Sequence, residues 1–145
     1  DHGWHLGEHA IWGKHALFEE SLRSPLIISH SGLANPGKAT LAMVETLDIF
    51  PTICELAGLK APGGLNGQSL VPILKNPAAK GHSAFAYKSG AQTIRTDTRR
   101  LIAHKSGQLE LYDHTSSAGE TENLAEAQPE KVETLLKQLR ERLSQ

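Results

Sequence analysis

The first fifteen residues hold four of the eight histidines of the chain, together with two carboxylates and a lysine. Asp1 and His2 are adjacent potential metal ligands, and Gly3 allows the backbone to turn sharply around such a site. A carboxylate suits a hard cation such as Ca²⁺ and an imidazole suits transition metals, so this pair alone leaves the metal open. Lys14 adds a compact positive charge on a flexible stem. Histidines that lie on the surface without any ligand are the alternative.

The same stretch contains a competing motif, H-x-x-E-H, formed by His5, Glu8 and His9. On a helix, this spacing places two zinc ligands one turn apart with the glutamate as a base. Gly7 inside the motif and Gly3 before it disfavour the helix that this chemistry requires. Zinc hydrolysis is therefore the weaker hypothesis, and we expect Glu8 and His9 to shape the loop through hydrogen bonds.

The composition is that of an ordinary folded domain of 145 residues, with 39% hydrophobic residues, 21% charged residues and a formal net charge of −1. These values exclude a disordered chain and give no reason to expect nucleic acid as a partner. The longest apolar runs are far shorter than a membrane span, so we expect no membrane partner. The single cysteine excludes an internal disulfide framework and a multi-thiolate zinc site.

The first half of the chain carries few regular elements. Residues 1–20 read as loop with short helical pieces, and 26–29 read as a buried strand that follows a proline. Residues 46–58 predict a helix with a broad apolar side that contains Cys54 as a buried, structural thiol. One helical turn is expected at 69–74. A single buried strand cannot form a parallel sheet, so part of the core of this half is expected outside the chain.

The second half has a different pattern. Four short strand-like runs separated by turn residues predict a small antiparallel sheet, at 84–88, 92–95, 101–104 and 108–112. Pro129 stands where a helix begins. Apolar residues then recur with the period of an amphipathic helix, at Val132, Leu135, Leu136, Leu139 and Leu143.

The opening motif D-H-G-W-H-L-G-E-H, followed by Trp12-Gly13-Lys14 and by the segment 18–28, resembles the C-terminal half of a type I sulfatase. Within that family it is most similar to the iduronate-2-sulfatase-like subgroup. Further blocks match in the same order and extend the resemblance over essentially the whole chain, at 48–52, 56–58, 67–70, 72–74, 94–96, 110–113 and 122–125.

The resemblance implies an α/β fold, namely the C-terminal part of an alkaline-phosphatase-like sulfatase. Residues 1–82 would be the end of the catalytic α/β domain. Residues 83–145 would be a C-terminal subdomain with a small antiparallel sheet and an amphipathic helix. The reaction implied is hydrolysis of sulfate esters, assisted by calcium and by a formylglycine nucleophile made from Cys or Ser.

The resemblance also implies roles for individual residues. Asp1 and His2 would be two of the calcium ligands. Lys14 would be catalytic and contact the sulfate oxygens. Trp4 and His5 would lie near the mouth of the substrate site. A divalent ion and an ammonium group aimed at the sulfate oxygens would supply electrostatic stabilisation of the reacting centre.

One departure from the family pattern is decisive for activity: the formylglycine-forming C/S-x-P-x-R motif is absent. We therefore expect the chain to be the C-terminal portion of a longer sulfatase, with the N-terminal part of the same enzyme as its partner, and to be inactive alone. A sulfated saccharide, such as a glycosaminoglycan sugar, is the expected substrate. No targeting signal is read from the chain, and the resemblance implies a periplasmic, secreted or lysosomal protein.

Two other functions stay open. A phosphodiesterase or phosphonate monoester hydrolase of the same superfamily would carry similar C-terminal motifs. An inactive, glycan-binding remnant is the non-enzymatic alternative, although the basic residues are scattered along the chain and the net charge is slightly negative.

Overall fold

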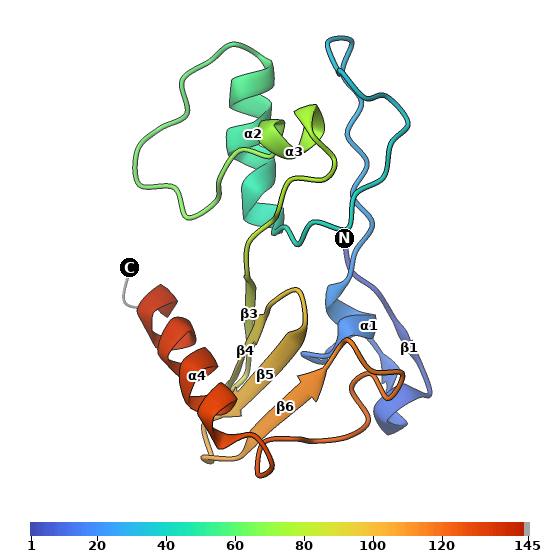
Figure 1. The fold of residues 1–145 in the computed structure, drawn as a ribbon, viewed down its shortest axis with the longest axis vertical. Helices are drawn as coiled ribbons and strands as arrows, with labels where there is room; N and C mark the ends of the chain where they lie inside the picture. The colour runs from blue at the N-terminus through green and yellow to red at the C-terminus, as the bar shows by residue number, and fades with distance from the viewer. Residues whose placement is uncertain (144–145) are drawn as a thin grey trace. The chain divides into compact units, whose positions relative to one another are not determined.

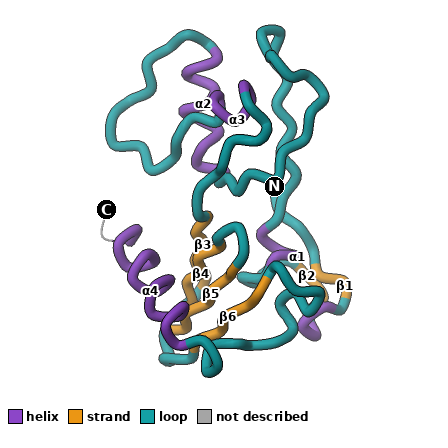
Figure 2. The backbone as a smooth tube through the Cα atoms, in the orientation of Figure 1, coloured by secondary structure: helices purple, strands orange, loops and turns teal. Residues whose placement is uncertain are grey.

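The computed structural model describes residues 1–143 and contains two compact units (Figures 1 and 2). The first unit combines Asp1–Leu26 with the chain from Phe85 onward, and the second consists of Ile27–Ala84. Segments from the two ends of the sequence thus share one unit. No helix among the described residues is long and apolar enough to cross a membrane.

A four-stranded sheet is the centre of the first unit, and it confirms the predicted set of short strands. Its strands lie in sequence order: β3 (Ala84–Lys88), β4 (Ala91–Arg95), β5 (Arg99–His104) and β6 (Leu109–Asp113). The pairs β4–β5 and β5–β6 are antiparallel. Gly90 and Gly107 adopt positive φ angles of 94° and 93° in the tight turns, which explains the use of glycine there.

Helix α4 (Pro129–Leu143) begins at the predicted proline and packs against this sheet (Figure 1). In the register of the sheet, Leu101 lies opposite Leu111, and both side chains are fully buried. Each such buried side chain contributes about 1.5–3 kcal/mol through removal of apolar surface from water. The core between sheet and helix consists of Ile94, Leu101, Leu111, Val132, Leu135 and Leu139.

The N-terminal segment packs on a second cluster of sheet residues. There, Leu17 joins Ile102 and Tyr112 in a separate buried cluster. Successive residues of a strand point to opposite faces, so Leu101 and Ile102 serve different clusters. The segment itself consists of four short elements: β1 (His5–Leu6), the 3₁₀ helix η1 (Glu8–Ala10), β2 (Trp12–Gly13) and α1 (Glu19–Leu22).

The second unit is built around one predicted helix, of which the first turn is a 3₁₀ helix. The 3₁₀ helix η2 (Thr46–Asp48) leads directly into α2 (Ile49–Leu56), and α3 (Val71–Lys75) follows. Cys54 is buried in α2, as predicted. The hydroxyl of Thr52 joins the elements, because it donates to the carbonyl of Asp48 at 2.6 Å and accepts the Leu70 N–H at 2.8 Å.

Two details differ from the sequence analysis. The predicted buried strand at 26–29 is wrong: no strand forms there, and Leu26 and Ile27 are 42% and 90% exposed. An apolar run becomes a buried strand only where neighbouring strands pair with it, and the described residues supply none. The short hairpin β1–β2 was not predicted, because two-residue strands have no readable alternation.

The assignment of 1–82 and 83–145 to two domains concerns the longer enzyme and stays a prediction. Within this chain, the compact units divide the sequence differently. Residues 1–26 lie with the C-terminal sheet because Leu17 and Phe18 pack on it.

Candidate functional site

Of the three residues that the sequence predicted to act together, His2 lies next to both Asp1 and Lys14. The Lys14 ammonium donates to His2 Nε2 at 2.6 Å, and Asp1 Oδ1 lies 3.4 Å from the same nitrogen. His2 Nδ1 donates to the carbonyl of Gly3 at 2.7 Å, which leaves Nε2 as an acceptor. The arrangement therefore presents a carboxylate oxygen and an imidazole lone pair side by side, next to a mobile positive charge.

The hairpin explains how Lys14 reaches residues twelve positions earlier. In its register His5 pairs with Gly13, and Leu6 pairs with Trp12. Lys14, which directly follows β2, therefore lies beside the residues that precede His5. The backbone of Gly13 has a φ of 153°, a conformation that favours glycine at this bend.

Gly3 fixes the other side of the site. Its N–H donates to the carbonyl of Ser21 at 2.9 Å, so the chain lies directly against α1. A Cβ at this position would lie 1.9 Å from the backbone oxygen of Glu20, which leaves room only for glycine. This close approach holds Asp1 and His2 in place relative to α1.

The two predicted substrate residues point in different directions. Trp4 is 48% exposed, and its ring lies 6.2 Å from that of His2 at an interplanar angle of 39°. His5 is 0% exposed, and its Nδ1 forms a hydrogen bond with the hydroxyl of Ser21 at 3.0 Å. The structure thus brings Trp4 to the cluster of Asp1, His2 and Lys14 and turns the His5 ring into the interior. The substrate role of His5 stays a prediction, and its burial favours a structural role.

Glu8 shapes the turn between the two strands of the hairpin. Its carboxylate accepts the N–H of Leu6 at 2.6 Å. Hydrogen bonds from backbone N–H groups, its own and that of Leu6, lower the pKa of this exposed carboxyl. Gly7 has a φ of 130°, so no helix continues from His5 to His9 and the helical H-x-x-E-H arrangement does not form.

A buried ion-pair network attaches α1 to the sheet, and the sequence analysis did not find it. Arg100 is 1% exposed; its Nε contacts Glu120, and its Nη2 donates to Glu19 at 2.6 Å. Arg95 donates to the same Glu19, and His114 lies 2.8 Å from Glu120. These partners are up to 81 residues apart in sequence, so no local pattern could have shown them.

The charges of this network shift the titration of its members. Burial alone would raise the pKa of Glu120, but hydrogen bonding with His114 and the positive charge of Arg100 outweigh it and lower that pKa. Burial lowers the pKa of Arg95, and the neighbouring Glu19 opposes this shift. The network thus contains charged groups that stabilise one another, and it positions the segment that carries the candidate site.

Comparison with known proteins places the chain in a family. Residues 7–145 match the family described as "N-sulphoglucosamine sulphohydrolase, C-terminal". A sulfatase of Formosa agariphila is 37% identical over 127 residues, which cover 86% of this chain and 25% of the relative. The chain therefore spans about a quarter of the length of that curated relative.

Solved structures share the fold of this chain. The structure of BT4656 in complex with its substrate D-glucosamine-2-N,6-O-disulfate matches with a TM-score of 0.84 and 29% identity, over 97% of this chain and 32% of that chain. A phosphonate monoester hydrolase from Silicibacter pomeroyi matches with a TM-score of 0.83 and 26% identity, over 99% of this chain and 33% of that chain. The predicted alkaline-phosphatase-like sulfatase fold is thereby confirmed, whereas the iduronate-2-sulfatase-like subgroup stays a prediction. The chain belongs to the N-sulphoglucosamine sulphohydrolase C-terminal family, as the C-terminal domain of a type I sulfatase.

Proposed function

We propose that the protein hydrolyses sulfate esters of sugars, and that this chain supplies two calcium ligands and a lysine that contacts the sulfate. The observation that carries the proposal is the position of His2 Nε2, which lies 3.4 Å from Asp1 Oδ1 and 2.6 Å from the Lys14 ammonium in a chain of the sulfatase family. The substrate bound to the similar solved structure, a glucosamine disulfate, supports a sulfated sugar as the substrate class.

The donor atoms of Asp1 and His2 fit a shared cation. They lie 3.4 Å apart, a separation that two ligands of one ion commonly have. The hydrogen bond of His2 Nδ1 to a backbone carbonyl orients the lone pair of Nε2, as is usual for metal-bound histidines. Calcium prefers oxygen donors, so its remaining ligands would be oxygens from residues outside this chain. When bound, calcium would supply positive charge to the sulfate oxygens.

Lys14 would complement that charge. Its ammonium lies at 2.6 Å from His2 Nε2, so a ligand on this nitrogen releases the lysine to donate to an anion next to it. An ammonium on a flexible stem can follow the sulfate oxygens as negative charge develops on them. The formylglycine nucleophile that the resemblance implies would come from another part of the enzyme.

Trp4 would provide a contact for the sugar. Its partly exposed indole lies beside His2, so an apolar sugar face can pack on it while the sulfate lies toward Lys14. The inward orientation of the buried His5 ring favours a supporting role for this residue.

The experiment that tests this function measures sulfate release from D-glucosamine-2-N,6-O-disulfate by the full-length protein. We expect Lys14→Ala to lower kcat by about 100-fold or more, the usual effect of removing a group that stabilises developing charge. Asp1→Asn should lower activity and weaken its restoration by calcium after chelation. The exposed lysine in Lys38→Ala is the matched control. Equal activity of Lys14→Ala and Lys38→Ala would refute the role of Lys14.

Phosphonate monoester hydrolysis is the second candidate, favoured by the similar structure from Silicibacter pomeroyi. A parallel assay with a phosphonate monoester distinguishes the two, because faster turnover of that substrate than of any sulfate ester would assign the alternative. We also expect the isolated chain of 145 residues to release no sulfate.

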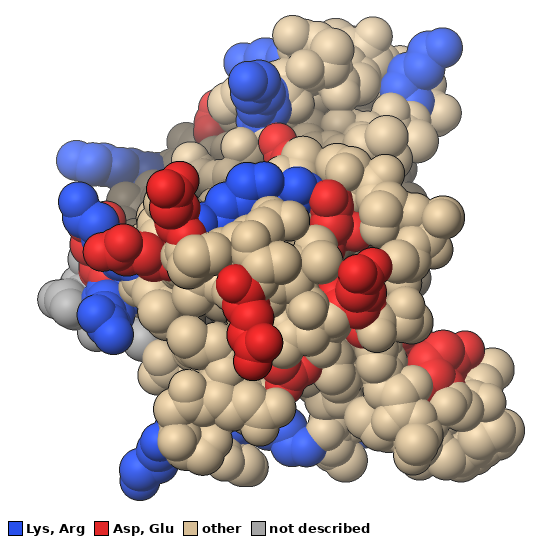
Figure 3. All heavy atoms as spheres, turned by 60° about the horizontal axis from the view of Figure 1, so that its bottom comes forward, with Lys and Arg blue, Asp and Glu red and all other residues tan. Residues whose placement is uncertain are grey.

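A glycan-binding remnant is less well supported. Arg95, Arg99 and Arg100 are all engaged by carboxylates, namely Glu19, Glu120 and Asp113. Acidic and basic side chains lie interspersed on the face drawn in Figure 3. A sulfated polymer would therefore meet acidic groups as well as basic ones on that face.

A further inference from the structure

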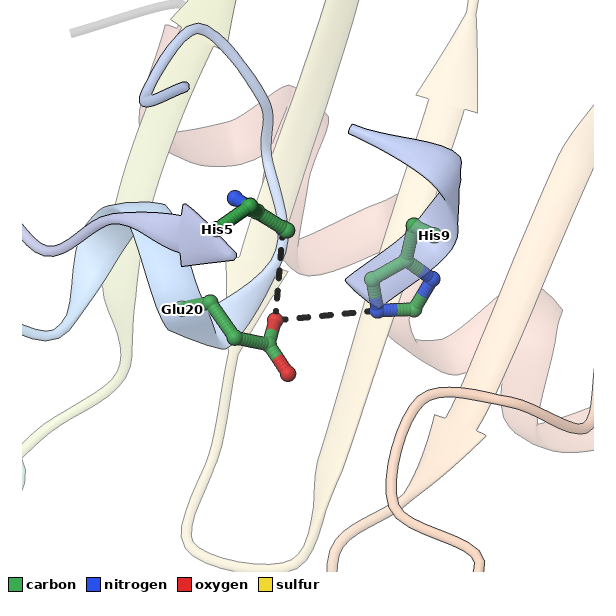
Figure 4. Close-up of side chains that lie close together, drawn as sticks. All are labelled: His5, His9 and Glu20. Carbon is green, nitrogen blue, oxygen red and sulfur yellow. Dashed lines mark ion pairs between the residues drawn. The ribbon is translucent and has the colours of Figure 1, made fainter. Parts of the chain in front are cut away.

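We propose that His5, His9 and Glu20 bind one divalent transition-metal ion, with zinc as the best match, at a site separate from the predicted calcium ligands. The three side chains converge from β1, η1 and α1 (Figure 4). One ligand atom of each lies within 4.8 Å of the others. Two imidazoles and a carboxylate form a donor set typical of zinc and unlike the oxygen-rich sets of calcium.

Two buried atoms at the centre of the cluster lack hydrogen bonds. These are Nε2 of His5 and Oε2 of Glu20, and among the described residues neither has a hydrogen-bond partner. They face each other at 3.4 Å, and His5 is 0% exposed. Leaving such polar atoms unpaired in the interior is energetically unfavourable. A cation bound between them would remove that cost.

The spacing of the atoms matches a tetrahedral ion. With metal–ligand distances of about 2.0–2.2 Å, two ligands of a tetrahedral zinc lie roughly 3.3–3.6 Å apart. Glu20 Oε2 lies 3.4 Å from His5 Nε2 and 3.6 Å from His9 Nε2. Both separations already have the required length, so binding needs only a small movement of the two imidazoles toward each other.

Neighbouring groups orient both imidazoles. The buried hydroxyl of Ser21 lies 3.0 Å from His5 Nδ1, the position at which metal-bound histidines commonly have a second hydrogen bond. The ring of His9 is stacked on Phe18, with centroids 3.8 Å apart and an angle of 2°. His9 also adopts a φ of 54°, which is uncommon for a residue other than glycine and turns its ring toward α1.

The ion would link the turn after β1 to α1. Glu8, the acid of the H-x-x-E-H motif, is not a member of the site, because its carboxylate caps the N–H of Leu6. His5 and His9 are the two histidines of the motif, and the third ligand, Glu20, comes from α1 outside the motif. The alternative is a protonated imidazole that forms an ion pair with Glu20 and binds no metal.

Calorimetric titration of the full-length protein with zinc chloride, with calcium present in excess, separates these alternatives. We expect a tight zinc site that Glu20→Gln removes. His9→Ala should lower the zinc affinity at least about 10-fold, because loss of a residue that only orients a metal ligand already has an effect of that size. His15→Ala is the matched control, because its exposed imidazole lies in the same segment. Cobalt(II) in place of zinc should show the strong visible absorption of tetrahedral coordination, lost in the same variants.

Zinc binding that is equal in the unsubstituted protein, Glu20→Gln and His9→Ala, or the absence of zinc binding, would overturn the proposal in favour of the ion pair. Circular dichroism checks that each variant folds. If Glu20→Gln does not fold, His9→Ala decides the test. The result is independent of the sulfatase assay, so the two proposals fail separately.

Discussion

Replacement of Glu120 by glutamine tests whether the buried ion-pair network holds the N-terminal segment on the sheet. The Glu120 side chain is 2% exposed and contacts Arg100 Nε, His114 Nε2 at 2.8 Å and the backbone N–H of Glu19 at 2.7 Å. Glutamine keeps the shape but removes the charge, and its amide donors face groups that also donate.

The size of the effect follows from what Arg100 retains. Removal of one partner of a buried ion pair costs about 3–5 kcal/mol, because the other charge stays buried and uncompensated. Arg100 keeps Glu19 at 2.6 Å, so the lower end of that range applies. We therefore expect a loss of about 3 kcal/mol in the local free energy of unfolding. Since about 1.4 kcal/mol is a factor of ten, the protected amides of β5 should exchange roughly 100-fold faster.

Hydrogen–deuterium exchange of the full-length protein measures this change for β5 directly. Glu122→Gln is the matched control, because Glu122 is exposed and lies two residues from Glu120. An acceleration of less than about fivefold in Glu120→Gln, or an equal one in Glu122→Gln, would show that the network does not stabilise the sheet.

The same network predicts a pH dependence. The pKa of Glu120 lies below its ordinary value of 4.5 in the folded protein, so its stabilisation is complete above that pH and is lost on acidification through the lowered value. The difference in melting temperature between the unsubstituted protein and Glu120→Gln should therefore shrink as the pH falls below 4.5. A difference that stays constant down to acid unfolding would contradict this assignment.

Three further substitutions test the packing. Gly3→Ala places a Cβ 1.9 Å from the Glu20 carbonyl, so we expect slower sulfate release while exchange of the sheet amides stays unchanged. Thr52→Val leaves the Leu70 N–H without its acceptor and should lower the local stability of α2 by about 1–3 kcal/mol, measurable by hydrogen exchange. Leu101→Ala removes a fully buried side chain and should cost about 2–5 kcal/mol in the sheet, with faster proteolysis as a second readout.

The regular elements of the C-terminal half could be predicted because their signals are local. Alternation along the strands and the spacing of leucines in 129–143 both reflect burial of one face of one element. The run at 26–29 has the same apolar character, yet its burial depends on neighbours that the described residues do not provide. Sequence alone cannot show whether such neighbours exist.

For the candidate site, the sequence indicated the residue types but not their arrangement in space. The residue types of Asp1, His2 and Lys14 carried the resemblance, and the hairpin register brings them together. Trp4 and His5 were expected to act together, but adjacent residues of an extended chain point to opposite sides. The convergence of His5 and His9 on Glu20 depends on the fold of three separate elements, so the spacing of the motif could not show it.

Residues 1–26, which carry the candidate site, pack on the C-terminal sheet, so the sheet supports the position of that site. A truncation after Ala84 would remove the surface on which Leu17 rests and the arginines that hold Glu19. If Asp1 and Lys14 have the roles proposed above, substitutions in β5 or β6 would lower catalysis by displacing both residues. Under the proposed function, the C-terminal sheet would thus act as a support that aligns the candidate site, and loss of activity in β5 or β6 variants would indicate misalignment of Asp1, His2 and Lys14.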